Sequence, residues 1–115
     1  MIQCKRVYES PTKEDGYRVL VDRLWPRGVK KTDLHYDEWC KTLAPSTELR
    51  KAFHGEAIDF AAFSESYRQE LDAQKEEGKK LAARGKESAV TLLFAAKNTE
   101  QNHAIVLADW LRTLA

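Results

Sequence analysis

A chain of 115 residues, 43% hydrophobic and 32% charged, predicts a single globular domain spanning residues 1–115 and excludes a disordered segment. No apolar run approaches the roughly 18 residues that a membrane span needs, and no hydrophobic stretch follows the first residues. We therefore expect a cytoplasmic protein without a membrane segment, and the net charge of +1 argues against a broadly basic nucleic-acid-binding face.

The first quarter of the chain predicts two strands. The segments from Ile2 to Tyr8 and from Tyr17 to Leu24 are rich in aliphatic and β-branched residues, and the turn signal Asp15-Gly16 separates them. Their connection is too short for an ordinary crossover helix. A hairpin and a parallel pair with an unusual connection both remain open.

Two short helices are expected next. Asp33 is a suitable N-cap for a helix that ends before Pro45, and its apolar face would hold Tyr36, Trp39 and Leu43. Ser46 is the expected cap of a second helix, which Gly55 ends and whose inward residues are Leu49 and Phe53.

The longest helical candidate runs from Asp59 to Arg84. Its apolar residues recur every three or four positions, at Phe60, Phe63, Tyr67 and Leu71. Gly78 costs about 1 kcal/mol relative to alanine inside a helix, so fraying or a break is expected there.

The last quarter predicts a buried strand and a closing helix. Residues 89–95 form an almost continuous apolar run, which is typical of a strand buried on both faces. Asn98 is the expected N-cap of the helix that follows. These elements together predict an α/β fold: a three-layer sandwich with a small, mostly parallel sheet and helices on both faces.

Polar residues that could form a site follow two of the predicted strands. Asp22, Arg23 and Arg27 come at the end of the second strand, where ligands gather in α/β proteins. Lys97, Asn98 and Asn102 follow the buried strand, at a helix N-terminus that favours an anion. Guanidinium groups suit anions because of their planar set of donors.

His103 begins an otherwise apolar helix face, with Leu107, Trp110 and Leu114 at spacings of four, three and four residues. Its imidazole should therefore turn towards the interior near the strand end. The functional interpretation is a general base or ligand donor, and the structural one is a core histidine bonded to a backbone carbonyl or to Asp22. Likewise, Arg23 and Arg27 are either anion ligands or partners of surface carboxylates.

Three ordered blocks resemble the domain-of-unknown-function 488 family, and most closely its YeaO-like branch. The blocks are Val21 to Gly28, Leu49 to Gly55 and Leu92 to Leu111. The resemblance covers essentially the whole chain and implies a small α/β fold. It also implies that other branches carry cysteines at the places of Phe94 and Asn102, so a cysteine-dependent mechanism is not expected here.

The leading interpretation is a polar, anion-binding pocket at the carboxyl ends of the strands, for a nucleotide or another small phosphorylated ligand. His103 would carry a proton, Asp22 would orient it, and Arg27 with Lys97 would bind negative charge, while Arg23, Asn98 and Asn102 complete the ligand-binding set.

Two alternatives remain open. One is a non-enzymatic module that binds nucleic acid or a regulator through the basic patch, which we define as Arg23, Arg27, Lys30 and Lys31. The other is a structural subunit with Trp25 or Trp39 at an interface. The sequence predicts no cofactor and no metal site, and Cys4 and Cys40 are expected to be reduced thiols.

Overall fold

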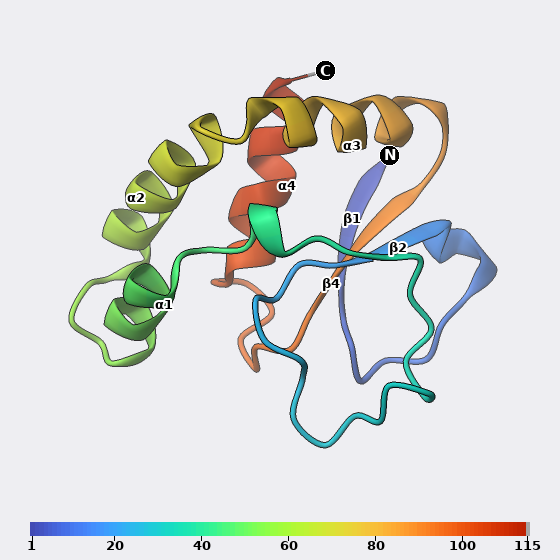
Figure 1. Cartoon of the computed structure of the whole chain (residues 1–115), viewed down its shortest axis with the longest axis horizontal. Coiled ribbons are helices and arrows are strands. Elements are labelled where there is room, and N and C mark those ends of the chain that lie inside the picture. Colours follow the sequence, from blue (N-terminus) through green and yellow to red (C-terminus); the bar gives the residue numbers. More distant parts are fainter. Residues whose placement is uncertain (115) are drawn as a thin grey trace.

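The computed structural model, which describes residues 1–114, is built on a sheet of four parallel strands in the order β1-β4-β2-β3 (Figure 1). The strands are β1 (Ile2–Arg6), β2 (Tyr17–Leu20), β3 (Glu38–Trp39) and β4 (Val90–Phe94). All five residues of β4 are buried, as its apolar run predicts, because β4 lies between β1 and β2.

The relation between the first two strands is neither of the two alternatives that the sequence left open. β1 and β2 are parallel, but each pairs with β4 rather than with the other. The connection between them contains a single turn of 3-10 helix, Lys13–Asp15, and needs no crossover helix. β2 also ends earlier than predicted, at Leu20 rather than at Leu24.

Residues 1–114 form four α-helices: α1 (Thr47–His54), α2 (Phe60–Asp72), α3 (Lys75–Glu87) and α4 (His103–Thr113). The predicted cap of α1, Ser46, is confirmed, and the start predicted for the longest helix, Asp59, is the N-cap of α2. The Ser46 side chain accepts from the N–H of Leu49, and the Asp59 side chain accepts from the N–H of Ala62.

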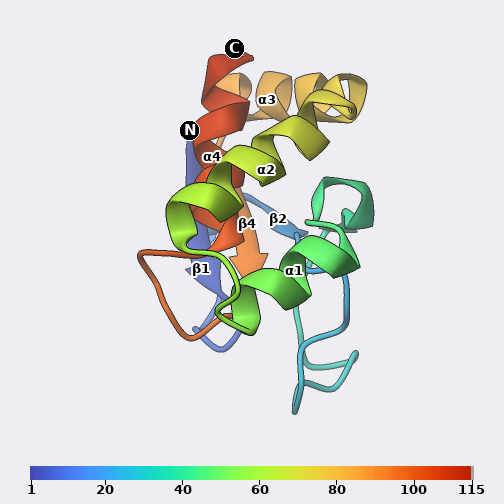
Figure 2. The ribbon, with the colours of Figure 1, turned by 90° about the vertical axis from the view of Figure 1, so that its left-hand side faces the viewer.

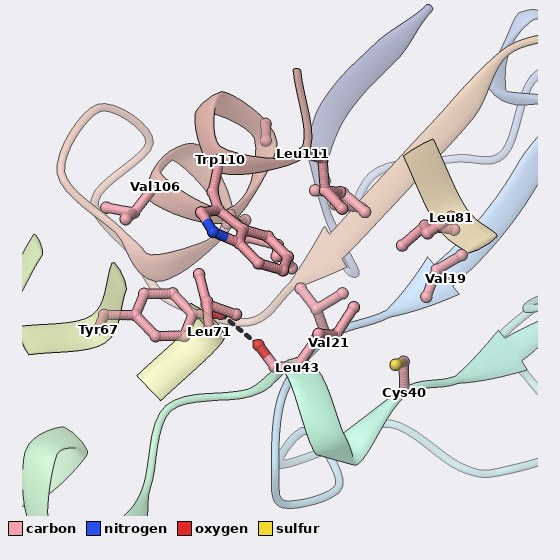
Figure 3. Packing of buried hydrophobic residues seen from close by; sticks show 14 of the residues in the cluster. Val19, Val21, Cys40, Leu43, Tyr67, Leu71, Leu81, Val106, Trp110 and Leu111 are labelled. Carbon is pink, nitrogen blue, oxygen red and sulfur yellow. Dashed lines mark hydrogen bonds between the residues drawn. The ribbon is translucent and has the colours of Figure 1, made fainter. Parts of the chain in front are cut away.

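The main core lies between the sheet and the helices, and its apolar residues come from all four helices (Figure 3). The hydroxyl of Tyr67 on α2 donates to the carbonyl of Leu43, in the segment that leads to α1. Trp110 of α4 donates from Nε1 to Asp72 Oδ1 at 3.0 Å, which joins α4 to the end of α2.

The α/β class and the parallel sheet are confirmed, but the layers differ in one respect. The helices contribute buried residues to one face of the sheet, and Leu20 and Leu93 on the opposite face are covered by the long segment between β2 and β3. Leu34 is buried in that segment, with Trp25 and Tyr36 packed against the same cluster. This aromatic-rich loop replaces the helix that the sequence predicted for that face.

The helix predicted from Asp33 is wrong. The chain there forms β3 and a 3-10 turn, Lys41–Leu43, instead. The N–H groups of Asp37 and Cys40 donate to carbonyls of β2, so the open edge of the sheet takes the backbone donors that a helix would use.

Two predicted helix boundaries are also wrong. The chain turns between α2 and α3 at Ala73 and Gln74 rather than at Gly78, which is buried inside α3. α4 begins at His103 and is capped by Asn102, not by Asn98. The polar residues from Asn98 to Gln101 consequently lie in the connection before α4 rather than in the helix.

Viewed from the side, α1 and the segment from Phe94 to Asn102 both lie near the end of the sheet to which β4 points (Figure 2). Within residues 1–114, the helices are too short or too polar for any of them to cross a bilayer.

Candidate functional site

Asp22 joins the ends of the two central strands. Because β2 ends at Leu20, Asp22 lies in the segment that leaves the sheet, and its Oδ2 accepts from the N–H of Ala95 at 3.1 Å. A carboxylate oxygen thus replaces the backbone carbonyl that would have continued the ladder beyond β4. The two polar segments that the sequence placed about seventy positions apart therefore meet.

The second contact of Asp22 is with His103, the first residue of α4. His103 Nε2 lies 2.9 Å from Asp22 Oδ1, and both side chains are 15% exposed. These two buried atoms form no hydrogen bond with each other, and neither has another partner among the described residues. The imidazole and the carboxylate are therefore in contact, and His103 Nε2 and Asp22 Oδ1 both remain without a hydrogen bond.

A cleft of about 1050 Å³ opens beside this pair. One side is formed by the segment after β2, from Asp22 to Arg27, and another by the segment after β4, from Ala95 to His103. The remaining wall comes from α1, from the connection between α1 and α2, and from the start of α2. The lining therefore combines charged groups at the strand ends with apolar rings on the helices.

Of the two predicted anion-binding arginines, Arg23 is engaged by the protein itself. Its Nε donates to the carbonyl of Pro45 at 2.9 Å, and its Nη2 donates to that of Ala44 at 3.3 Å. Arg27 is exposed at the cleft, and its backbone carbonyl accepts from the hydroxyl of Tyr8. Arg23 thus braces the segment before α1, whereas Arg27 has its guanidinium at the surface.

Three predicted residues after β4 also line the cleft, but they differ in exposure and in the hydrogen bonds of their side chains. Lys97 is exposed. Asn98 is exposed too, but its side-chain oxygen accepts from the N–H groups of Glu100 and Gln101. Asn102 is only 1% exposed, since its side chain caps α4 and donates to the carbonyl of Asn98. Of these three residues, Lys97 is therefore the one whose side-chain polar group is free to meet a ligand.

Several cleft residues were not recognised from the sequence. Arg50, Phe53 and His54 all line the cleft from α1, where spacings of three and four residues place them on one helix face. Phe60 and Phe63 of α2 continue that wall, and the rings of Phe53 and Phe63 stack with centroids 4.4 Å apart. The signal was present in the Leu49 to Gly55 block, but only its cap and apolar residues were interpreted.

The backbone of Glu56, between α1 and α2, has a φ of 61°. This left-handed conformation costs a non-glycine residue about 1–2 kcal/mol, so the fold holds this part of the cleft rim in a strained turn.

The basic patch is divided, because Arg23 and Arg27 line the cleft whereas Lys30 and Lys31 do not. Trp25 packs edge-on against Tyr36 and Trp39, and its Nε1 donates to the carbonyl of Val29 at 2.6 Å. Lys31 lies over the Trp25 ring, with its Nζ 5.8 Å from the ring centroid. Both tryptophans are half-buried and belong to the cluster on the second face of the sheet.

A separate group of possible metal ligands lies away from the cleft. Ligand atoms of Glu38, Cys40 and Glu77 are within 4.8 Å of one another, beside a cavity of about 210 Å³ that Lys80 and Arg84 also line. Burial raises the pKa of the Cys40 thiol. Both carboxylates already have partners, since Lys80 Nζ lies 3.5 Å from Glu77 Oε1 and the Tyr17 hydroxyl donates to Glu38 Oε1. Cys4 and Cys40 are both free thiols.

Comparison with known proteins gives consistent relatives. The family described as "Inactive DUF488-N3 subclade" matches residues 1–115. The protein named "Uncharacterized protein YeaO" of Escherichia coli K12 is 65% identical over 98% of this chain and 98% of its own length. "Uncharacterized protein Rv3073c" of Mycobacterium tuberculosis and "Uncharacterized protein Mb3100c" of Mycobacterium bovis are each 42% identical over 96% of this chain and 92% of their own. No solved structure matches the chain.

Proposed function

Because the chain belongs to the inactive DUF488-N3 subclade, we propose that it is a binding domain that holds a small phosphorylated ligand in the cleft at the strand ends. The observation that carries the proposal is the convergence of the segments after β2 and β4 on one cleft, through the contacts of Asp22 with Ala95 and His103. Parallel α/β folds bind their ligands at the carboxyl ends of the strands, where this cleft lies.

The charge of the lining favours an anion. The cleft contains four permanently cationic side chains and three carboxylates, and one carboxylate, Asp22, is already engaged at its floor. Arg27 and Lys97 are exposed at the cleft, in the segments that follow the neighbouring strands β2 and β4. An anion between them replaces the water around two charged groups with a charge-assisted contact.

Binding is favoured over covalent catalysis by the lining residues. Among the described residues that line the cleft there is no serine, threonine, tyrosine or cysteine. The positions at which the resemblance implies cysteines in other branches hold Phe94, which is buried in the main core, and Asn102, which caps α4. Neither residue supplies a thiol or a hydroxyl, so the cysteine-dependent chemistry implied for other branches has no counterpart at these two positions.

The test is a titration of the isotope-labelled protein, followed by NMR, with nucleotides, sugar phosphates and inorganic phosphate. We expect saturable shifts in the segments 22–27 and 95–103. Lys97→Ala should weaken binding about tenfold, because a charged contact is lost. Lys86→Ala, which removes an exposed charge near the end of α3, should leave the affinity unchanged. Shifts absent from both segments would contradict the proposal.

A second candidate is proton transfer by His103, and the 2.9 Å contact with Asp22 supports it. Incubation of the bound ligand with the protein, followed by phosphorus NMR, separates the two: turnover that His103→Gln abolishes favours catalysis, and an unchanged ligand favours binding alone.

The basic patch offers the remaining alternative, a nucleic-acid module. A mobility assay over a salt series tests it, since phosphate contacts make affinity fall steeply with salt. We expect no DNA complex at moderate salt, because Arg23 is bonded to two carbonyls. A salt-sensitive complex that Lys30→Ala and Lys31→Ala weaken would favour that module instead.

A further inference from the structure

The wall that α1 contributes to the cleft has an unused cation at its centre. Within residues 1–114, Arg50 Nε is buried and has no hydrogen-bond partner. A buried donor without a partner costs free energy, and a ligand acceptor that reaches this donor would remove the cost. Arg50 therefore differs from Arg23, whose donors are occupied by carbonyls of the protein.

The same wall carries flat apolar rings beside that cation. Phe53 follows Arg50 by three positions on α1, and Phe60 lies 5.9 Å from Phe53 between ring centroids. Both rings are half-buried and line the cleft, whereas Phe63 behind them is 1% exposed. A charged group and an exposed aromatic surface are thus adjacent on one side of the cleft.

An isolated phosphate would leave most of the cleft unfilled. A volume of about 1050 Å³ lies in the range of sites for organic ligands and cofactors. A ligand that satisfies this wall must carry an anionic group and, a few ångströms away, a flat ring.

We infer that α1 forms the specificity wall of the site, with Arg50 binding the phosphate of the ligand and Phe53 and Phe60 packing against its ring. The ligand class is then a ring-bearing phosphate, as in a mononucleotide. This inference rests on the proposed function and names its ligand class. His54, at the end of the same helix face, supplies a further polar group at the cleft.

The experiment compares three probes by NMR titration: adenosine 5′-monophosphate, adenosine and ribose 5-phosphate. We expect the monophosphate to bind more tightly than either fragment. Arg50→Gln should weaken the monophosphate and ribose 5-phosphate about tenfold or more and leave adenosine unchanged. Phe53→Leu should weaken the monophosphate and adenosine about fivefold or more and leave ribose 5-phosphate unchanged.

Lys51→Gln is the matched control, because Lys51 is exposed on α1 and does not line the cleft. Unchanged affinities of Arg50→Gln for all three probes, with Lys97→Ala still weakened, would overturn the role of α1 and leave the proposed function standing. Equal affinity of the wild-type protein for ribose 5-phosphate and the monophosphate would overturn the ring contact. If the wild-type protein binds none of the probes, both proposals are wrong.

Discussion

Two arginines that line the cleft differ in their hydrogen bonding to the rest of the protein. The guanidinium of Arg23 donates to the carbonyls of Pro45 and Ala44, whereas Arg50 has a buried donor without a partner. We expect Arg23→Gln to lower the free energy of unfolding by about 1–3 kcal/mol, because two carbonyls lose a charged donor. Arg50→Gln should change it by less than about 0.5 kcal/mol. Urea unfolding of both variants measures this difference, and equal losses would contradict it.

At the scale of single residues, the sequence predicted the floor of the site better than its wall. His103 was placed correctly because its spacing to Leu107 and Trp110 is local information about one helix. The position of Arg50 at the cleft was missed because it depends on how α1 packs near the strand ends, and no local spacing encodes that packing. The role of Arg23 was equally hidden, since its partners are backbone carbonyls that any sequence would supply.

At the scale of elements, Gly78 shows how packing changes the meaning of a residue. The sequence predicted a weak point in the helix at Gly78, but α3 continues through it. A Cβ at this position would lie 2.4 Å from ring atoms of Trp110 and 2.8 Å from Leu114 Cδ1, so only glycine fits without a shift of its neighbours. The glycine permits close contact of α3 with α4. Similarly, the helix predicted from Asp33 is absent because an open strand edge binds its backbone.

Gly78→Ala should therefore destabilise the protein although alanine favours helices. Overpacking costs typically about 1–3 kcal/mol, which exceeds the gain in helix propensity of about 1 kcal/mol. Thermal unfolding measures the net effect, with Ala83→Gly, at an exposed position of the same helix, as the control for propensity alone. A higher midpoint for Gly78→Ala would contradict the packing argument.

At the scale of the whole molecule, the class and the buried central strand followed from pattern, but the layers did not. The apolar run of β4 predicts a central strand, with a neighbouring strand on each edge and other residues covering both faces. It does not state which segments provide them. The second face is closed partly by the aromatic loop after β2 and partly by a buried ionic cluster, in which Asp15 meets Lys5 and Arg18.

This cluster predicts how the fold responds to acid. Asp15 is 3% exposed, and although burial opposes its ionisation, hydrogen bonds from Thr12, Lys5 and Arg18 outweigh burial and lower its pKa to about 2. Because the pKa in the folded state lies below that of the unfolded chain, this stabilisation is complete above about pH 4. It is lost as the pH falls towards 2. The shift corresponds to roughly 2 kcal/mol.

Unfolding by urea at a series of pH values between 2 and 6 measures the effect. Thr12→Ala removes the side-chain hydrogen bond from Thr12 Oγ1 to Asp15 Oδ1, so we expect its loss of stability to begin at a higher pH than in the wild-type protein. Asp33→Asn, which neutralises an exposed carboxylate outside the cluster, should leave the profile unchanged. Asp15→Asn should remove the Asp15 component of the acid transition and lower stability at neutral pH by about 3–5 kcal/mol, because Arg18 is left buried without its partner. A wild-type stability that stays constant between pH 4 and 2 would show that this ionic cluster does not hold the second face of the sheet closed.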